Sequence, residues 1–80
     1  MVKVKIYAVV RLDTGVKEFN CSAKNITEVI GILNEKRAKG ADEIRWKDII
    51  VFVNGERISS RRAKLNDGDK VDIMSPVSGG

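Results

Sequence analysis

The N-terminal part of the chain alternates between apolar and polar residues. Aliphatic residues occupy every even position of residues 2–10, and a shorter alternation over residues 16–21 makes Phe19 and Cys21 the candidates for a buried face. A period of two residues is typical of a strand with one buried side. Gly15, between the two segments, suits a tight turn. The pattern therefore predicts two strands joined as a β-hairpin.

The repeat then changes to a helical one. Apolar residues recur three and four positions apart, at Ile26, Val29, Ile30 and Leu33. Such spacing gives a helix one apolar face. Asn25 is a suitable N-cap and Gly40 a suitable C-terminal stop, so we expect a helix over residues 26–39. Gly31 lies inside this helix at a cost of about 1 kcal/mol relative to alanine, and we expect it to permit close packing.

Strand signals return in the second half of the chain. β-Branched residues recur at every second position, Ile49, Val51 and Val53, and are followed by an Asn-Gly pair at 54–55, which is typical of a type I′ hairpin turn. A short returning strand is expected at residues 56–59. A second turn around Gly68 precedes an apolar segment at residues 71–74, which we expect to be the last strand.

The order of these elements favours an α+β fold. It suits one mixed sheet of four to five strands, with a single helix across one face and with the first and last strands side by side. In this order the chain resembles the β-grasp fold of ubiquitin-like proteins. We expect the domain to occupy residues 1–74 and a flexible Gly-Gly tail to occupy residues 75–80.

Length and charge limit the class of protein. A chain of 80 residues has room for one small core. Lys3 and Lys5 interrupt the first apolar segment, which therefore lacks the continuous apolar sequence of a signal peptide or a membrane helix. We expect a soluble, cytoplasmic protein that does not enter a membrane. The net charge of +4 is compatible with an acidic partner, with nucleic acid or with solubility alone.

The composition also argues against several kinds of chemistry. The sequence has one cysteine and no histidine, which excludes an internal disulfide and gives no support to a zinc cluster or a histidine base. We expect no metal site. Cys21 alternates with Phe19 and is expected in the core as a small apolar residue.

Three segments carry a specific resemblance. "VNGERI", "LNDGDKVDI" and "SPVSGG" follow one another in the last third of the chain. Together they resemble the ubiquitin-like sulfur carriers (the MoaD/ThiS type): the small subunit of molybdopterin synthase, the thiamine sulfur carrier and the archaeal ubiquitin-like modifiers. The ending "PVSGG" is most similar to the molybdopterin branch, although Ser75 stands where that branch commonly has a first proline.

The resemblance implies a function for the C-terminal glycine. In this family an E1-like adenylating enzyme uses ATP to activate the terminal carboxylate, and a sulfur donor converts it to a thiocarboxylate. Gly80 would carry the sulfur, and Gly79 would be its steric companion. In the molybdopterin branch the sulfur passes to a pterin precursor inside the larger catalytic subunit of molybdopterin synthase. The resemblance thus implies a carrier that binds no cofactor and is not an enzyme by itself.

The tail residues are physically suited to this use. An α-carboxylate is ionised at neutral pH, so it needs no side-chain base to attack a phosphorus atom. Gly79 and Gly80 lack Cβ atoms, so their backbone fits a channel too narrow for side chains. Six extended residues span roughly 20 Å. Pro76 fixes its own φ angle and favours an extended Ser75, which lowers the entropy lost on insertion.

Partner contacts are expected in the tail, at the end of the last strand and at basic residues earlier in the chain. We assign Ser75, Pro76 and Ser78 to the inserted tail and Met74 with Val77 to its apolar anchor. The basic residues Arg57, Arg61 and Arg62 are candidates for contact with an acidic partner.

Three alternative functions stay open. The chain could be a covalent protein modifier joined through Gly80 to a target lysine, or a sulfur carrier for thiamine or tRNA thiolation. It could also be a noncovalent nucleic-acid-binding module, which we disfavour because the basic residues are not interleaved with the aromatic residues that base stacking needs.

Overall fold

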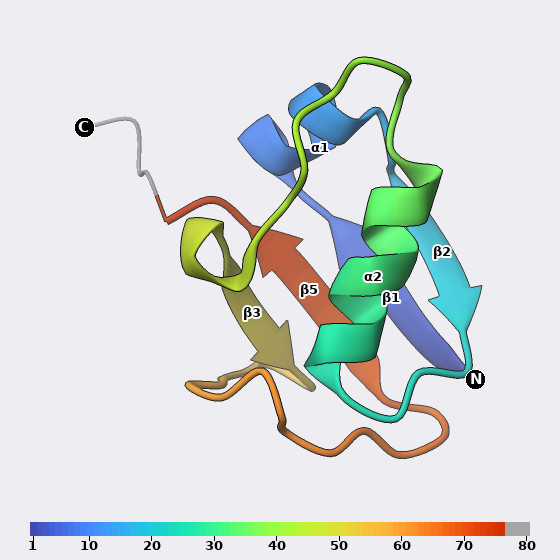
Figure 1. The fold of residues 1–80 in the computed structure, drawn as a ribbon. Helices are drawn as coiled ribbons and strands as arrows, with labels where there is room; N and C mark the ends of the chain where they lie inside the picture. The colour runs from blue at the N-terminus through green and yellow to red at the C-terminus, as the bar shows by residue number, and fades with distance from the viewer. Residues whose placement is uncertain (77–80) are drawn as a thin grey trace.

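The structure, a computed structural model, describes residues 1–76, which form one mixed sheet of five strands with two α-helices and one 3-10 helix. In chain order the elements are β1 Val2–Ile6, α1 Ala8–Thr14, β2 Glu18–Cys21, α2 Ile26–Lys36, η1 Trp46–Asp48, β3 Ile50–Val53, β4 Glu56–Arg57 and β5 Lys70–Met74. Helix α2 lies across one face of the sheet, and α1 lies at one end of it (Figure 1). The expected α+β fold of the β-grasp type is confirmed.

The last strand lies in the middle of the sheet. The strand order is β2-β1-β5-β3-β4. β5 runs parallel to β1, with Val4 opposite Val71, and antiparallel to β3, with Val51 opposite Ile73. The prediction that the first and last strands lie side by side is therefore confirmed. The consequence for the site is that the segment leading to the tail has neighbours on both sides.

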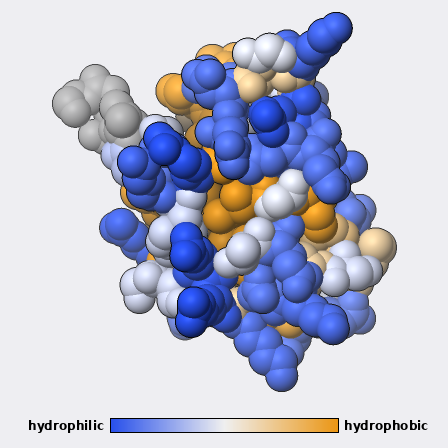
Figure 2. Space-filling view, in the orientation of Figure 1, coloured by the Kyte–Doolittle hydropathy of each residue, from blue (hydrophilic) through white to orange (hydrophobic). Residues whose placement is uncertain are grey.

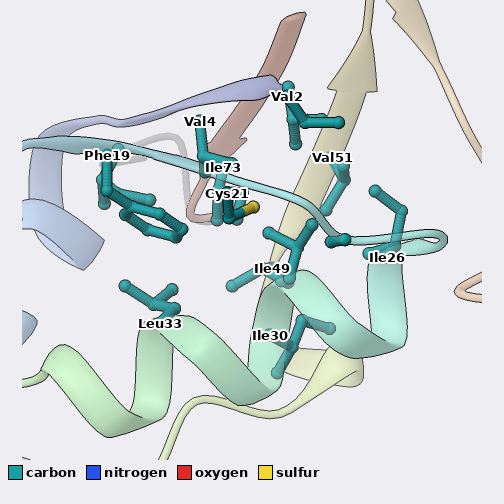
Figure 3. Close-up of a cluster of buried hydrophobic side chains, with 14 of the residues drawn as sticks. Val2, Val4, Phe19, Cys21, Ile26, Ile30, Leu33, Ile49, Val51 and Ile73 are labelled. Atoms are coloured by element: carbon teal, nitrogen blue, oxygen red, sulfur yellow. The ribbon is translucent and has the colours of Figure 1, made fainter. Parts of the chain in front are cut away.

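The core lies between the sheet and α2. Figure 3 shows side chains of the strands gathered against Ile26, Ile30 and Leu33 of the helix. Phe19 and Cys21 of β2 are among them, as the alternation predicted, and Cys21 is a buried free thiol. The even positions of β1 are buried and its lysines are exposed. One face of the sheet is thus packed on α2, and the opposite face is open.

The predicted hairpin is wrong in its connection. β1 ends at Ile6, and residues 8–14 form α1 instead of continuing the strand. The apolar alternation of the strand continues to residue 10 only by coincidence, because Val10 belongs to α1 and is buried as a residue of that helix. Gly15 is the C-cap of α1, with φ 74°, and its amide donates to the Arg11 carbonyl at 2.9 Å. The two strands still pair antiparallel, but a helix connects them.

Helix α2 begins as expected and ends earlier. The Asn25 side chain accepts a hydrogen bond from the Glu28 amide at 3.0 Å, which confirms the N-cap. The helix stops at Lys36 and not at residue 39, because Arg37 is extended and its side chain donates to the carbonyls of Asn34 at 2.7 Å and Ala41 at 3.0 Å. An arginine that satisfies carbonyls at the helix end makes a further turn unnecessary.

The two predicted turns are confirmed by their backbone angles. Asn54 and Gly55 have φ angles of 52° and 87°, the positive pair that a type I′ turn requires. Gly68 has a φ angle of 90°. The returning strand β4 is shorter than expected and ends at Arg57.

Gly31 is not a close-packing glycine, contrary to expectation. It is exposed on α2, and a Cβ atom at this position would meet no atom within 4 Å. Among residues 1–76 no helix is long and apolar enough to cross a membrane.

Candidate functional site

The tail leaves the sheet from its central strand. β5 ends at Met74, opposite Ile50 of β3, and the Ile73 carbonyl accepts a hydrogen bond from the Tyr7 amide at 2.9 Å. At this end of the sheet β1 leads into α1 (Figure 1). Ser75 is half-buried and Pro76 is exposed. The start of the tail is thus fixed by two neighbouring strands. Val77, Ser78, Gly79 and Gly80, which we expect to insert into a partner, lie outside the described residues.

Apolar side chains on the open face lie beside this exit. Met74, Ile50 and Phe52 are half-buried and do not belong to the core, and we call these three residues the open-face patch. Ile50 pairs with Met74 across the two strands. The sequence predicts a partner contact for Met74 but not for Ile50 or Phe52. The signal was present, because residues 49–53 are all apolar and a strand with a solvated face normally alternates.

Polar groups frame the open-face patch. The Tyr7 hydroxyl donates a hydrogen bond to Asp72 Oδ1 at 3.0 Å, and this bond raises the pKa of the Tyr7 phenol above its ordinary value. Lys5 Nζ lies 5.7 Å from the centre of the Tyr7 ring. On the other side Arg57 is opposite Phe52 in the register of β3 and β4. An apolar centre with a charged rim is the usual anatomy of a protein interface.

The predicted basic residues are distributed over two places. Arg57 is exposed on β4, at the edge of the sheet. Arg61 and Arg62 are exposed in the following loop. The Arg61 carbonyl accepts from the Thr27 amide at 2.9 Å and from the Thr27 hydroxyl at 3.1 Å, which ties the loop to the first turn of α2. This end of the sheet is opposite the tail exit (Figure 1). The basic loop is therefore not part of the surface around the tail.

The turn that precedes β5 is held by one carboxylate. Asp69 accepts hydrogen bonds from the Asn66 amide at 2.8 Å and from the Asn54 side chain at 3.0 Å, and these bonds hold the pKa of Asp69 below its ordinary value. Asn54 in turn accepts from the Lys70 amide at 2.9 Å. The turn at Asn54-Gly55 and the turn at Gly68 are thereby linked, and the start of β5 is fixed.

The described surface offers contacts for a partner and no reactive side-chain pair near the exit. Within residues 1–76 no three histidine, cysteine, aspartate or glutamate residues are grouped to hold a metal ion. The one thiol, Cys21, lies in the core. The described residues present the open-face patch to a partner, and β5 fixes the point at which the tail leaves the sheet.

The β-grasp fold and a C-terminal tail that follows the central strand together define a small ubiquitin-like protein of the carrier and modifier class. Residues 4–80 match the family model described as the ThiS family, and the chain belongs to that family. This match includes all six residues of the tail, 75–80. No curated protein matches the chain.

Three solved structures illustrate the similarity. One chain of the Amycolatopsis orientalis BexX/CysO complex is 27% identical, with a TM-score of 0.74 and coverage of 100% of both chains. The small archaeal modifier protein 1 from Methanosarcina acetivorans is 28% identical, with a TM-score of 0.74 and coverage of 99% of this chain and 95% of that one. One chain of the complex of subunits 1 and 2 of molybdopterin-converting factor from Helicobacter pylori 26695 is 25% identical, with a TM-score of 0.70 and coverage of 99% and 97%.

Proposed function

We propose that the protein is a sulfur carrier whose carrier group is a carboxylate on Gly80. The observation that supports this most directly is the match to the ThiS family, which extends through residue 80. In the proposed reaction the carboxylate attacks the α-phosphorus of ATP on an E1-like adenylating enzyme, and pyrophosphate leaves. A sulfur donor at the level of hydrosulfide then adds to the acyl carbon, and AMP leaves. The product is a thiocarboxylate.

The position of β5 supports this function. A carrier has to insert its end into a partner while its domain stays outside. The exit strand is held by β1 and β3, so the segment before the tail is already fixed when the tail is inserted. The open-face patch lies beside the exit and gives the partner an apolar surface to bind during insertion.

For the pathway we propose molybdopterin synthesis. The support is the "PVSGG" ending and the similarity to a chain of the Helicobacter pylori molybdopterin-converting factor. In this pathway the thiocarboxylate enters a larger catalytic subunit and gives its sulfur to a pterin precursor. The protein is then a carrier subunit and not a catalyst, and ATP is consumed by the activating enzyme.

A second candidate function is covalent modification of other proteins. It is favoured by the similarity to the small archaeal modifier protein 1, which is as close in fold as the carrier structures. The two functions share the adenylation step and differ in what attacks the activated glycine. A lysine amine would give a conjugate of higher mass, whereas sulfur gives a thiocarboxylate.

The test is the intact mass of the protein after incubation with activating enzyme, ATP and a sulfur donor. The wild type should gain the mass difference between sulfur and oxygen. A variant that lacks Gly79 and Gly80 should gain nothing, because the carboxylate moves onto Ser78 and the reach shortens by about 7 Å. A C-terminal tag should also prevent the gain, since it converts the carboxylate to an amide.

Melting curves provide the control for this experiment. The truncation removes no residue of the sheet, the helices or the turns described above, so the melting temperature should stay close to that of the wild type. Sulfur on the truncated protein would disprove Gly80 as the carrier group and would point to Cys21. Higher-mass conjugates without thiocarboxylate would favour the modifier function instead.

A further inference from the structure

A groove lies on the helix side of the molecule, away from the open-face patch. It has a volume of about 450 Å³ and runs between α2 and the segment that leads into β3. Ile30 of the helix and Ile44 and Trp46 of the segment provide its apolar lining. In Figure 2 hydrophobic surface is visible between hydrophilic side chains in the middle of this face. None of the sulfur chemistry proposed above involves this groove.

The groove is held open by hydrogen bonds between its two walls. The Asn34 side chain donates to the Ile44 carbonyl at 2.9 Å and accepts from the Ile44 amide at 2.7 Å. This pair of bonds fixes the segment to the last turns of α2. At the other end the Arg61 carbonyl is bonded to Thr27, as described above. A site whose walls are already positioned loses little entropy on binding.

Gly31 is the feature that the fold itself does not explain. A glycine inside a helix is unfavourable, and here no neighbour requires it, since a Cβ atom would meet nothing within 4 Å. Gly31 also lines the groove. Its missing side chain therefore leaves room along the helix wall, where a bound chain can approach the backbone closely.

The rim of the groove is mainly positive. Arg45, Lys47 and Arg61 line it together with one acidic residue, Glu43. Arg45 is paired with Asp48 at 3.3 Å, whereas no ion pair of Lys47 or Arg61 is seen within residues 1–76. The groove thus combines an apolar floor with two cations that are available to a ligand.

We propose that this groove binds a short extended segment of a partner protein that carries an aliphatic residue flanked by acidic residues. The helix wall from Thr27 to Asn34 is about 10 Å long at 1.5 Å per residue, which matches about three residues of extended chain. The aliphatic side chain lies on Ile30 and Ile44, the backbone passes Gly31, and the acidic residues face Lys47 and Arg61.

A peptide fits these features better than a nucleotide does. Trp46 is half-buried and packs against the core, so its ring is not a free stacking platform. Glu43 on the rim repels the clustered charges of a polyphosphate, whereas a peptide can direct its separate carboxylates toward Lys47 and Arg61 and away from Glu43. Two aliphatic residues on the floor favour an aliphatic side chain over a base.

The experiment uses Trp46, the single tryptophan of the sequence, as the reporter. The full-length protein is titrated with the blocked peptide Asp-Glu-Leu-Asp-Glu, and tryptophan fluorescence is followed. We expect a saturable change that weakens as salt is added. Peptides with glycine in place of leucine, or with lysines in place of the acidic residues, should bind at least tenfold more weakly.

Variants at Gly31 separate binding from folding. Gly31→Leu fills the groove and should weaken binding at least tenfold, while its melting temperature stays equal to that of the wild type or rises by a few degrees, because leucine is the better helix former. Glu35→Leu adds the same side chain to an exposed position of α2 outside the groove and should bind the peptide normally. Lys47→Glu should weaken binding about twofold to fivefold.

Three results would overturn the proposal. They are the absence of a saturable change with the acidic peptide, normal binding by Gly31→Leu, and a change produced by ATP in place of the peptide, which would assign the groove to a nucleotide. The titration needs neither Gly80 nor an activating enzyme. Its failure would therefore leave the proposed carrier function untouched.

Discussion

The buried hydroxyl of Thr14 should be worth more to this fold than its methyl group. Thr14 is fully buried at the end of α1, where its hydroxyl donates to the Val10 carbonyl at 2.7 Å and accepts from the Val16 amide at 3.2 Å. Its own carbonyl accepts from the Ala38 amide at 2.7 Å. The two informative substitutions are Thr14→Val, which keeps the shape and removes the hydroxyl, and Thr14→Ser, which does the opposite.

The size of each effect follows from these contacts. In Thr14→Val the buried Val16 amide loses its acceptor, at a cost of about 1–3 kcal/mol. For a domain of this size that lowers the melting temperature by roughly 4–8 °C per kcal/mol, or about 8–16 °C at the middle of the range. Thr14→Ser keeps both hydrogen bonds and loses one methyl group, about 1 kcal/mol, which corresponds to about 4–8 °C.

The assay is a pair of thermal melts, with hydrogen exchange of the Val16 amide as a second measurement. The valine variant should melt lower than the serine variant, and its Val16 amide should exchange faster than in the wild type. If serine is the more damaging substitution, packing and not hydrogen bonding holds this end of α1, and the reasoning fails.

Three further predictions concern charge and the thiol. Arg57→Glu, beside the open-face patch, should slow association with the proposed activating enzyme and reduce its salt dependence, whereas Arg62→Glu in the basic loop should not; stopped-flow binding at several salt concentrations tests this. The folded state holds the pKa of Asp69 below its ordinary value, so the ionised carboxylate stabilises the fold fully at pH values above the ordinary pKa. This stabilisation is lost as the pH falls through the lower pKa of the folded state. Asp69→Asn should therefore flatten the fall in melting temperature between about pH 5 and about pH 2. Cys21 should not react with a thiol reagent until the protein is unfolded in denaturant, as measured by absorbance.

The sequence predicted those elements whose signals are local. The cap of α2 at Asn25 and the turns at Asn54 and Gly68 depend on residues within a few positions, and each was found where expected. The apolar alternation also assigned Phe19 and Cys21 to the core correctly, because a strand fixes the side to which each residue points.

Helix α1 could not be found in the same way. It has seven residues, no side-chain cap at Tyr7 and no acidic residue in its first turn. A helix so short is not stable by propensity alone and depends on the burial of Val10 and Thr14 against the rest of the domain. The spacing of four residues between these two was the one helical signal. The sequence pattern predicts a hairpin turn at Gly15, but the left-handed conformation of a glycine serves equally well as a helix cap.

The end of α2 and the surfaces depended on contacts distant in sequence. No residue near Arg37 in the sequence indicates that the next residue, Ala38, donates its amide to the Thr14 carbonyl instead of continuing the helix. In the sequence, the one sign of the open-face patch is that residues 49–53, which include Ile50 and Phe52, are all apolar. Its place beside the tail exit follows from the pairing of β3 with β5, which no local pattern specifies.

The central position of β5 has a mechanical consequence. A partner that draws the tail into a channel pulls along the axis of β5, and the hydrogen bonds to β1 and β3 lie across that direction. They are loaded in shear on both sides together, whereas an edge strand such as β2 is held by one neighbour only. Traction on the tail should therefore move the domain as a whole against the partner before any strand is peeled from the sheet.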